Sequence, residues 1–217
     1  MQIKYTCLQY PDMNLRVSDS PKLRGYFGRK YHDEKILHNH NGEKFIYQYP
    51  LVQYKVIKGI PTIVGLASGS DVILNVGIHD NGIDTDGTYH NFGRTEIKTE
   101  LVEIGTCGKI QQYEFATPWI ALNQKNVVNY QGVDDIEKEE LLEQIMIGNM
   151  ISFSKGFNYA VKDRIRVKLN VTKVDVKLKG YDMIGFVGDF KSNFMLPNLA
   201  GLGRSPARGF GSVRVII

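Results

Sequence analysis

The sequence has little cysteine and no long hydrophobic run. Its two cysteines, Cys7 and Cys107, stand far apart, which provides neither a disulfide framework nor a Cys-x-x-Cys metal site. No apolar run reaches the roughly 18 residues that a membrane-spanning helix needs. The first residues, Met1 to Tyr5, already read as a strand and contain no signal-peptide core. We therefore expect a soluble, cytoplasmic protein with no membrane partner.

Positive charge is concentrated towards the end of the chain. The formal net charge of +4 over 217 residues is a weak indication by itself. A basic segment favours a polyanionic partner such as nucleic acid. From residue 162 onward the basic residues are Lys162, Arg164, Arg166, Lys168, Lys173, Lys177, Lys179, Lys191, Arg204, Arg208 and Arg214, and the acidic ones are Asp163, Asp175, Asp182 and Asp189. Acidic residues gather instead between Asp134 and Glu143, as is typical of a solvated helix face.

The first half of the chain predicts the order strand, helix, strand, strand, helix, strand. Ser18–Pro21 carries the capping side chains and the proline of a helix start, and the helix that follows is strongly basic. This order is that of a split β-α-β, ferredoxin-like unit. We expect the strands at 3–9, 45–57, 60–66 and 100–106, the helices at 18–31 and 68–76, and a long polar loop at 79–93.

The second half repeats that order. Its helix starts at a capping box formed by Asp134 and Glu137 and ends at Gly156. The sequence therefore predicts an α+β fold of two tandem ferredoxin-like domains, an N-terminal domain at residues 1–106 and a C-terminal domain at residues 107–217. We expect the remaining elements as strands at 110–116, 164–178, 183–191 and at the end of the chain, a connection at 119–130, and a short helix or turn at 194–199.

One strand of the second half presents a row of cations. From residue 164, apolar and polar residues alternate, so that Arg164, Arg166 and Lys168 point outward. At Thr172–Lys173 the apolar phase slips by one residue. A β-bulge, or a strand that passes from the core into a protruding hairpin, would produce such a slip.

The segment from Gly201 to Gly211 has an unusual composition. It places two Gly-apolar-Gly units around a five-residue insert that carries Arg204 and Arg208. Glycine permits positive φ and close approach of a ligand, successive backbone N–H groups form an anion-binding concavity, and arginine suits phosphate. An ordinary glycine-rich hairpin loop is the alternative. A Walker loop is excluded because no Gly-Lys-Ser/Thr follows, and a Rossmann fingerprint is excluded because a strand follows instead of a helix.

All five histidines lie in the first half, and two of them form the sequence His38-Asn39-His40. An imidazole can act as a general base or a general acid near neutral pH. In an extended loop His38 and His40 face the same side, and Lys30 and Tyr47 are close in sequence. Two alternatives stay open: the pair consists of ordinary exposed loop histidines, or it binds zinc, although no further ligand stands at suitable spacing.

The glycine-rich segment resembles the C-terminal signature of the repeat-associated RNA-binding (RAMP) superfamily of CRISPR systems. Leu23–Gly28, the histidine loop and Tyr49–Lys55 resemble the b-type branch of its repeat-processing endoribonucleases, the Cas-six group. This resemblance implies two tandem ferredoxin-like domains and cleavage of precursor CRISPR RNA within each repeat, without a metal or another cofactor.

The resemblance also implies which residues take part. The catalytic group corresponds to His38, His40, Lys30 and Tyr47, in which one histidine is the base and the other the acid. Attack of a 2′-hydroxyl on the adjacent phosphate leaves a 2′,3′-cyclic phosphate and a 5′-hydroxyl, Lys30 stabilises the charge of the phosphorane, and Tyr47 orients a proton partner or the phosphate. The expected RNA-binding residues are Gly201, Gly203, Arg204, Arg208, Gly209, Gly211, Arg164, Arg166 and Lys168, and none of the site residues is a metal ligand.

Two rival functions are compatible with the same residues. A non-catalytic RNA-binding subunit of a CRISPR effector complex would share the fold and the glycine-rich segment but would need no histidine pair. An unrelated ferredoxin-like interaction domain would carry the basic strand only as surface. The expected partner of the first two is CRISPR repeat RNA, and the sequence leaves open whether the chain forms a homodimer or associates with an effector complex.

Overall fold

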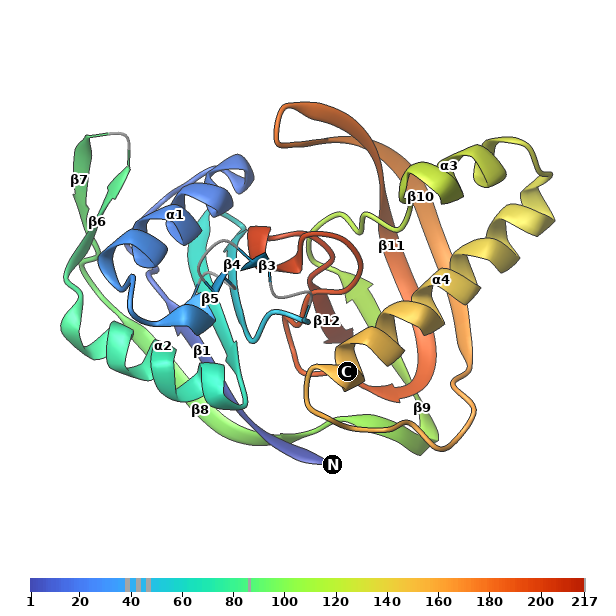
Figure 1. Ribbon diagram of the computed structural model, residues 1–217, viewed down its shortest axis with the longest axis horizontal. Helices are drawn as coiled ribbons and strands as arrows, with labels where there is room; N and C mark the ends of the chain where they lie inside the picture. Colours follow the sequence, from blue (N-terminus) through green and yellow to red (C-terminus); the bar gives the residue numbers. More distant parts are fainter. Residues whose placement is uncertain (38–39, 42–43, 46–47, 86, 217) are drawn as a thin grey trace. The chain divides into compact units, whose positions relative to one another are not determined.

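Two four-stranded antiparallel sheets form the framework of the residues that this computed structural model describes, which are 1–37, 40–41, 44–45, 48–85 and 87–216 (Figure 1). Each sheet belongs to one of two compact units. Unit 1 comprises residues Met1–Glu103 and Pro206–Gly209, and unit 2 comprises residues Ile104–Ser205 and Phe210–Ile217. Pro206–Gly209, the middle of the glycine-rich segment, therefore groups with unit 1, although it lies about 100 residues after the rest of that unit in the sequence.

Unit 1 has the strand order β4-β5-β1-β8, which gives a ferredoxin-like β-α-β-β-α-β arrangement. Its main elements are β1 (Gln2–Gln9), α1 (Ser20–Lys30), β4 (Val52–Ile57), β5 (Ile60–Leu66), α2 (Ser68–His79) and β8 (Glu96–Glu103). Pro21 stands in the first turn of α1, as the sequence predicts. The smaller elements are η1 (Val17–Asp19), η2 (Lys35–Leu37), the hairpin of β2 (His40–Asn41) and β3 (Lys44–Phe45), and the hairpin of β6 (Gly82–Thr85) and β7 (Thr88–Asn91).

One face of the sheet in unit 1 packs against α1 and α2. Leu8 of β1, Phe27 of α1 and Ile73 of α2 are fully buried in this core. The ring of Phe27 stacks on Tyr54 of β4 at a centroid distance of 5.9 Å and on Phe92 at 6.4 Å. The basic helix α1 is thereby fixed to the sheet through its apolar face.

On the other face of the same sheet, β4 is buried as well, and this face carries a lysine. Lys55 in β4 has no exposed surface, and its Nζ donates to Oε1 of Gln53 at 2.8 Å. Gln53 in turn donates from Nε2 to the hydroxyl of Tyr49 at 2.6 Å and to the carbonyl of Pro50 at 3.1 Å. Burial, opposed weakly by the charge of Cys7, lowers the pKa of Lys55 to about 7. The sheet therefore contains an ionisable group whose charge is disfavoured by folding.

Unit 2 has the strand order β10-β11-β9-β12. Its elements are β9 (Gly105–Phe115), α3 (Gln124–Gln131), α4 (Asp135–Lys155), β10 (Val167–Leu178), β11 (Tyr181–Met195) and β12 (Val213–Ile216). The predicted capping box of α4 is confirmed, because Oδ1 of Asp134 accepts from the amide of Glu137 at 2.9 Å and Oε2 of Glu137 accepts from the amide of Asp134 at 3.3 Å. The predicted end of α4 at Gly156 is also confirmed.

The second half departs from a complete repeat of the first between β11 and β12. The described chain has only the three-residue 3-10 helix η3 (Pro206–Arg208) there, in place of a second long helix. The glycine-rich segment thus occupies the position in the chain that the second helix of a ferredoxin-like unit would take. No helix in the described part of the chain is long and apolar enough to cross a membrane.

Four expected elements are corrected. The loop expected at 79–93 contains the hairpin β6–β7, which is anchored by the fully buried Ile83. The connection expected at 119–130 contains α3 (Gln124–Gln131), which buries no residue fully. The strand expected at 45–57 narrows to β4, and Phe194 continues β11 instead of starting a turn.

The hairpin β10–β11 accounts for the slip in apolar phase. Its register runs unbroken from the pair Val167–Ser192 to the pair Leu178–Tyr181, so no bulge lies between these two strands. The register of the sheet shifts between β11 and β9 instead, from Ser192 to Phe194. Of the two predicted causes of the slip, the structure therefore favours a strand that continues from the core into an extended hairpin.

Candidate functional site

The path of the glycine-rich segment depends on conformations that favour glycine. Gly203, Gly209 and Gly211 have φ angles of +82°, +93° and +64°. A Cβ on Gly203 would lie 2.6 Å from Nε1 of Trp119, and a Cβ on Gly211 would lie 2.0 Å from the carbonyl oxygen of Leu202. At these positions glycine serves the packing of the segment itself.

We expect Gly211→Ala to lower the free energy of unfolding by about 3 kcal/mol, because a clash with a backbone carbonyl adds to the cost of a positive φ. Gly180→Ala is the matched control. Gly180 has φ +84° in the turn between β10 and β11, and no described atom lies within 4 Å of its Cβ position, so only the conformational cost of about 1 kcal/mol remains. Denaturant unfolding measures both variants, and equal losses would contradict the packing role of Gly211.

Several backbone amides of the glycine-rich segment already donate within the protein. The amide of Leu202 donates to the carbonyl of Gly211 at 2.9 Å, that of Arg204 to Ile120 at 3.0 Å, and that of Gly211 to Pro118 at 2.8 Å. The anion-binding concavity expected from free amides therefore does not include these three groups. For binding of an anion, the arginine side chains carry more weight than the sequence suggests.

The two arginines of the glycine-rich segment group with different units. Arg204 is exposed in unit 2, and its Nη1 donates to the carbonyl of Leu122 at 3.4 Å. Arg208 groups with unit 1, and burial followed by the positive charge of Arg208 lowers the pKa of Arg24 in α1. A phosphate would relieve the repulsion between the two guanidinium groups. Arg24 is therefore a candidate that the sequence shows only as one of several cations in a basic helix.

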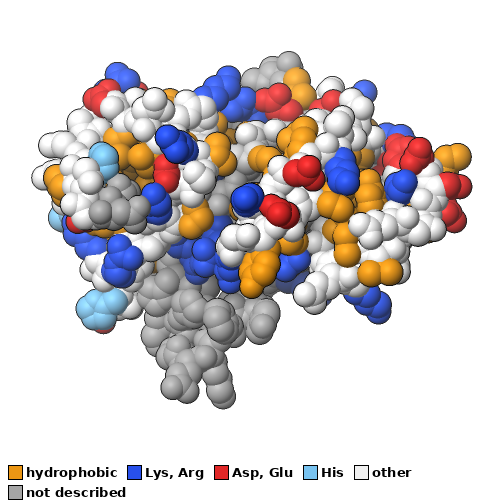
Figure 2. Space-filling view, turned by 90° about the horizontal axis from the view of Figure 1, so that it is seen from above, with side chains coloured by type: hydrophobic (Ala, Val, Ile, Leu, Met, Phe, Trp, Pro, Cys, Tyr) orange, Lys and Arg blue, Asp and Glu red, His pale blue; other side chains and the backbone are white. Residues whose placement is uncertain are grey.

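The strand expected from residue 164 begins only at Val167, so Lys168 alone of the expected cation row stands on β10, and Arg164 and Arg166 lie in the segment before it. Arg164 and Arg166 are exposed. Lys168 is exposed as well, but its Nζ lies 2.5 Å from Glu139 and 3.4 Å from Glu143 of α4, and the hydrogen bond to Glu139 is the main cause that raises its pKa. Figure 2 shows acidic side chains gathered at the end of unit 2 where α4 begins. Because the carboxylates of Glu139 and Glu143 offset its charge, Lys168 is the weakest of the three cations for binding phosphate.

Lys30, the last residue of α1, is held by a buried carboxylate. Its Nζ forms an ion pair with Asp80, whose side chain is fully buried and also accepts from the hydroxyl of Tyr31 at 2.9 Å. A further bond runs from Nζ to the hydroxyl of Tyr26 at 3.3 Å. The hydrogen bond to Asp80 is the main cause that raises the pKa of Lys30. Its ammonium therefore stays protonated near neutral pH, which suits stabilisation of negative charge and not proton abstraction.

Of the four predicted catalytic residues, Lys30 is the one whose side chain is described. His38 and Tyr47 lie outside the described residues, and for His40 the structure describes the backbone, paired with Phe45 in the hairpin β2–β3. Within the described ranges, no group of histidine, cysteine, aspartate and glutamate side chains could hold a metal ion. The catalytic assignment stays a prediction.

Both units match families of known proteins. The model of the Cas6b N-terminal domain matches residues 1–103, and the model of the Cas6b C-terminal domain matches residues 105–216. A relative, an uncharacterised protein of Methanocaldococcus jannaschii, is 38% identical over 144 residues, which make up 66% of this chain and 95% of that protein.

Solved structures agree over the whole chain. A crystal structure of Cas6b is 38% identical, with a TM-score of 0.95, and covers 100% of both chains. A crystal structure of the CRISPR RNA processing endoribonuclease Cas6b is 35% identical, with a TM-score of 0.82, and again covers 100% of both chains. Csf5, a type IV Cas6 endonuclease, has a TM-score of 0.57 at 10% identity over 100% of both chains, which shows a common fold alone. The predicted tandem ferredoxin-like fold is confirmed.

Proposed function

The chain belongs to the Cas6b family, and from this premise we propose that it is an endoribonuclease that cuts precursor CRISPR RNA within its repeats without a metal ion. The match of both domain models along nearly the whole chain carries the proposal. It is supported by the relative of known structure that is described as a CRISPR RNA processing endoribonuclease and is 35% identical to this chain.

The proposed reaction is a transesterification within the RNA. One of His38 and His40 takes the proton of a 2′-hydroxyl, and the resulting oxygen nucleophile attacks the adjacent phosphorus. The bond from phosphorus to the 5′-oxygen breaks as the other histidine gives that oxygen a proton. A 2′,3′-cyclic phosphate and a 5′-hydroxyl result. Lys30 stabilises the extra negative charge of the phosphorane, and its raised pKa keeps it charged for this role.

Cleavage in EDTA tests the proposal. The purified chain is incubated with its own repeat RNA, and the ends of the products are analysed. We expect cutting at one position, with a 5′-hydroxyl and a 2′,3′-cyclic phosphate. The same RNA with a 2′-deoxy substitution at the scissile nucleotide is the control and should stay intact, because it lacks the nucleophile. Tight binding of the unmodified RNA without cutting would reject the proposal in favour of a non-catalytic RNA-binding subunit.

The arginines of the glycine-rich segment are proposed to bind the RNA backbone. We expect the double variant Arg204→Ala/Arg208→Ala to bind repeat RNA more weakly. Because two phosphate contacts are lost, its log affinity should also fall less steeply with log salt, with a slope smaller in magnitude by roughly 1.4 to 1.8. Lys98→Ala/Lys138→Ala is the matched control, since those lysines pair with Glu100 and Asp135 at 2.9 Å each. An unchanged slope in the arginine variant would argue against phosphate contacts there.

A further inference from the structure

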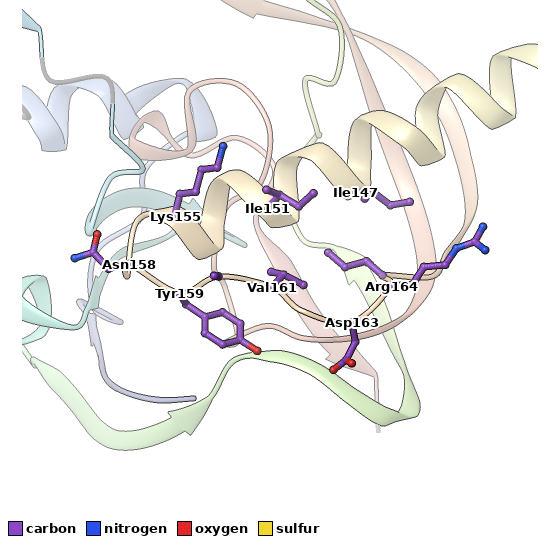
Figure 3. Close-up of a pocket in the computed structure, with 10 residues that line it drawn as sticks. Ile147, Ile151, Lys155, Asn158, Tyr159, Val161, Asp163 and Arg164 are labelled. Carbon is purple, nitrogen blue, oxygen red and sulfur yellow. The ribbon is translucent and has the colours of Figure 1, made fainter.

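A hollow of about 860 Å³ lies in unit 2 beside the C-terminal half of α4 (Figure 3). One wall is the helix, with Ile147 and Ile151, and the other is the segment that leads to β10, with Tyr159 and Val161. Ile151 is 38% exposed, so part of this aliphatic side chain is open to solvent. The surface of the hollow is therefore mainly apolar and includes one aromatic ring.

The segment that forms the second wall is fixed in place by polar contacts. The ring of Tyr159 lies against Gly105: a Cβ added to Gly105 would be 2.7 Å from Cε1 of Tyr159. Thr106 donates from Oγ1 to Asp163 at 3.1 Å, and Asn193 donates from Nδ2 to the carbonyl of Arg164 at 3.1 Å. These contacts come from β9 and β11, so the hollow is preformed.

Cations stand at the two ends of the hollow. In Figure 3, Lys155 lies at one end and Arg164 at the other, with the apolar residues between them. Both side chains are exposed. The one acid that lines the hollow, Asp163, already accepts the hydrogen bond from Thr106. An apolar floor with an aromatic ring, flanked by two cations, matches a nucleobase flanked by two phosphates.

We propose that this hollow binds one unpaired nucleotide of an RNA strand, with the base on Ile151, Val161 and Tyr159 and the flanking phosphates at Lys155 and Arg164. The inference rests on the proposed function for its choice of RNA as ligand. It adds a site that recognises a base, whereas the arginines of the glycine-rich segment contact only the backbone. Of these residues, Arg164 alone is expected from the sequence as an RNA-binding residue.

The apolar floor is tested with a pair of neutral substitutions on the same helix. Ile151→Gln should weaken binding of a fluorescent single-stranded oligouridylate about tenfold in anisotropy titrations, because a polar amide replaces part of the apolar surface on which the base lies. Ile136→Gln is the matched control, because Ile136 is 72% exposed near the start of α4 and lies outside the hollow. The control should bind like the wild type. Equal affinities of all three proteins would overturn the proposal.

The phosphate contact is tested with a matched pair of lysines on α4. In Lys155→Gln, log affinity should fall less steeply with log salt, with a slope smaller in magnitude by about 0.7, the value for one phosphate contact on a single strand. Lys138→Gln should leave the slope unchanged, since Lys138 pairs with Asp135 at 2.9 Å. A slope that is the same in Lys155→Gln and in the wild type would overturn the proposal.

Binding and cleavage are separable in this design. Titrations in EDTA with oligouridylate need no catalysis, so weaker binding by Ile151→Gln and Lys155→Gln would support the hollow even in a chain that never cuts repeat RNA. A chain that cuts repeat RNA but shows no loss in either variant would keep the proposed function and overturn the hollow. A change in the elution volume of Ile151→Gln with unchanged RNA affinity would also overturn it, and would indicate contact between copies of the chain.

Discussion

Replacing both His38 and His40 by alanine should reduce the rate of repeat cleavage by at least about 10⁴-fold, because each positioned proton donor or acceptor contributes roughly 10² to 10⁴. The affinity for uncut RNA should stay close to that of the wild type, since the arginines of the glycine-rich segment are unchanged. The rate is measured in single turnover, with protein in excess over RNA, so that product release does not mask the chemical step.

The pH dependence distinguishes a base and an acid from a merely structural pair. The wild type should show a bell-shaped rate profile, with one limb from the histidine that must be neutral and one from the histidine that must be protonated. Each single variant, His38→Ala or His40→Ala, should lose one limb. Lys30 should contribute no limb near neutral pH, because its hydrogen bond to Asp80 raises its pKa.

Two other histidines supply the matched control for this prediction. His32 lies 3.1 Å from Asp33, and Nδ1 of His79 lies 2.7 Å from the carbonyl of Asn75; both histidines are exposed. The double variant His32→Ala/His79→Ala should cut at the wild-type rate. Cutting that survives in His38→Ala/His40→Ala would show that the imidazoles of the loop are not the proton carriers.

Local rules predict parts of the fold whose ends are set by neighbouring residues. The capping box at Asp134 and the glycine after Lys155 define both ends of α4. The hairpin β6–β7 could not be predicted in the same way. Its sequence is rich in turn-forming residues, and its stability depends on burial of Ile83 in a core built by distant elements.

The candidate site shows the same division between local and distant causes. Strand periodicity predicts that Arg164 and Arg166 are exposed, and both are exposed, although they precede β10 in the structure. The partners of Lys30 and Lys168 do not follow from any local pattern, because Asp80 and Glu139 lie far away in the sequence. These pairings decide how much charge each lysine offers to a phosphate, so tertiary structure is needed to rank the candidates.

Lys55 is the clearest case in which periodicity misleads. In β4 it alternates with Tyr54 and Val56, a pattern that would place the lysine on a solvated face. The structure buries both faces of β4, and Lys55 has no exposed surface. A local pattern records one buried face well, but it cannot show whether the second face is covered.

Replacing Lys55 by methionine should therefore stabilise the protein, by on the order of 4 kcal/mol near pH 6. Burial lowers the pKa of Lys55 from its usual value of 10.5 to about 7, so below that pH the folded protein holds a buried ammonium group at its full cost. A lowering of this size corresponds to about 5 kcal/mol, and the lost hydrogen bond to Gln53 offsets about 1 kcal/mol of the gain.

The sign of the pH dependence makes this prediction specific. Above about pH 7 the folded state releases the proton of Lys55 while the unfolded chain keeps it to about pH 10, so the wild type gains stability as pH rises through this window. The advantage of Lys55→Met should shrink accordingly between about pH 6 and pH 9 in urea unfolding. Burial raises the pKa of Cys7, so this thiol lowers the stability of the folded protein at alkaline pH. The effect is the same in the wild type and in Lys55→Met, because both contain Cys7.

Lys58→Met, in the exposed turn after β4, is the control and should show no such change. An advantage of Lys55→Met that is equal at both ends of the pH range would mean that Lys55 keeps its proton in the folded protein, and that its burial carries no electrostatic cost.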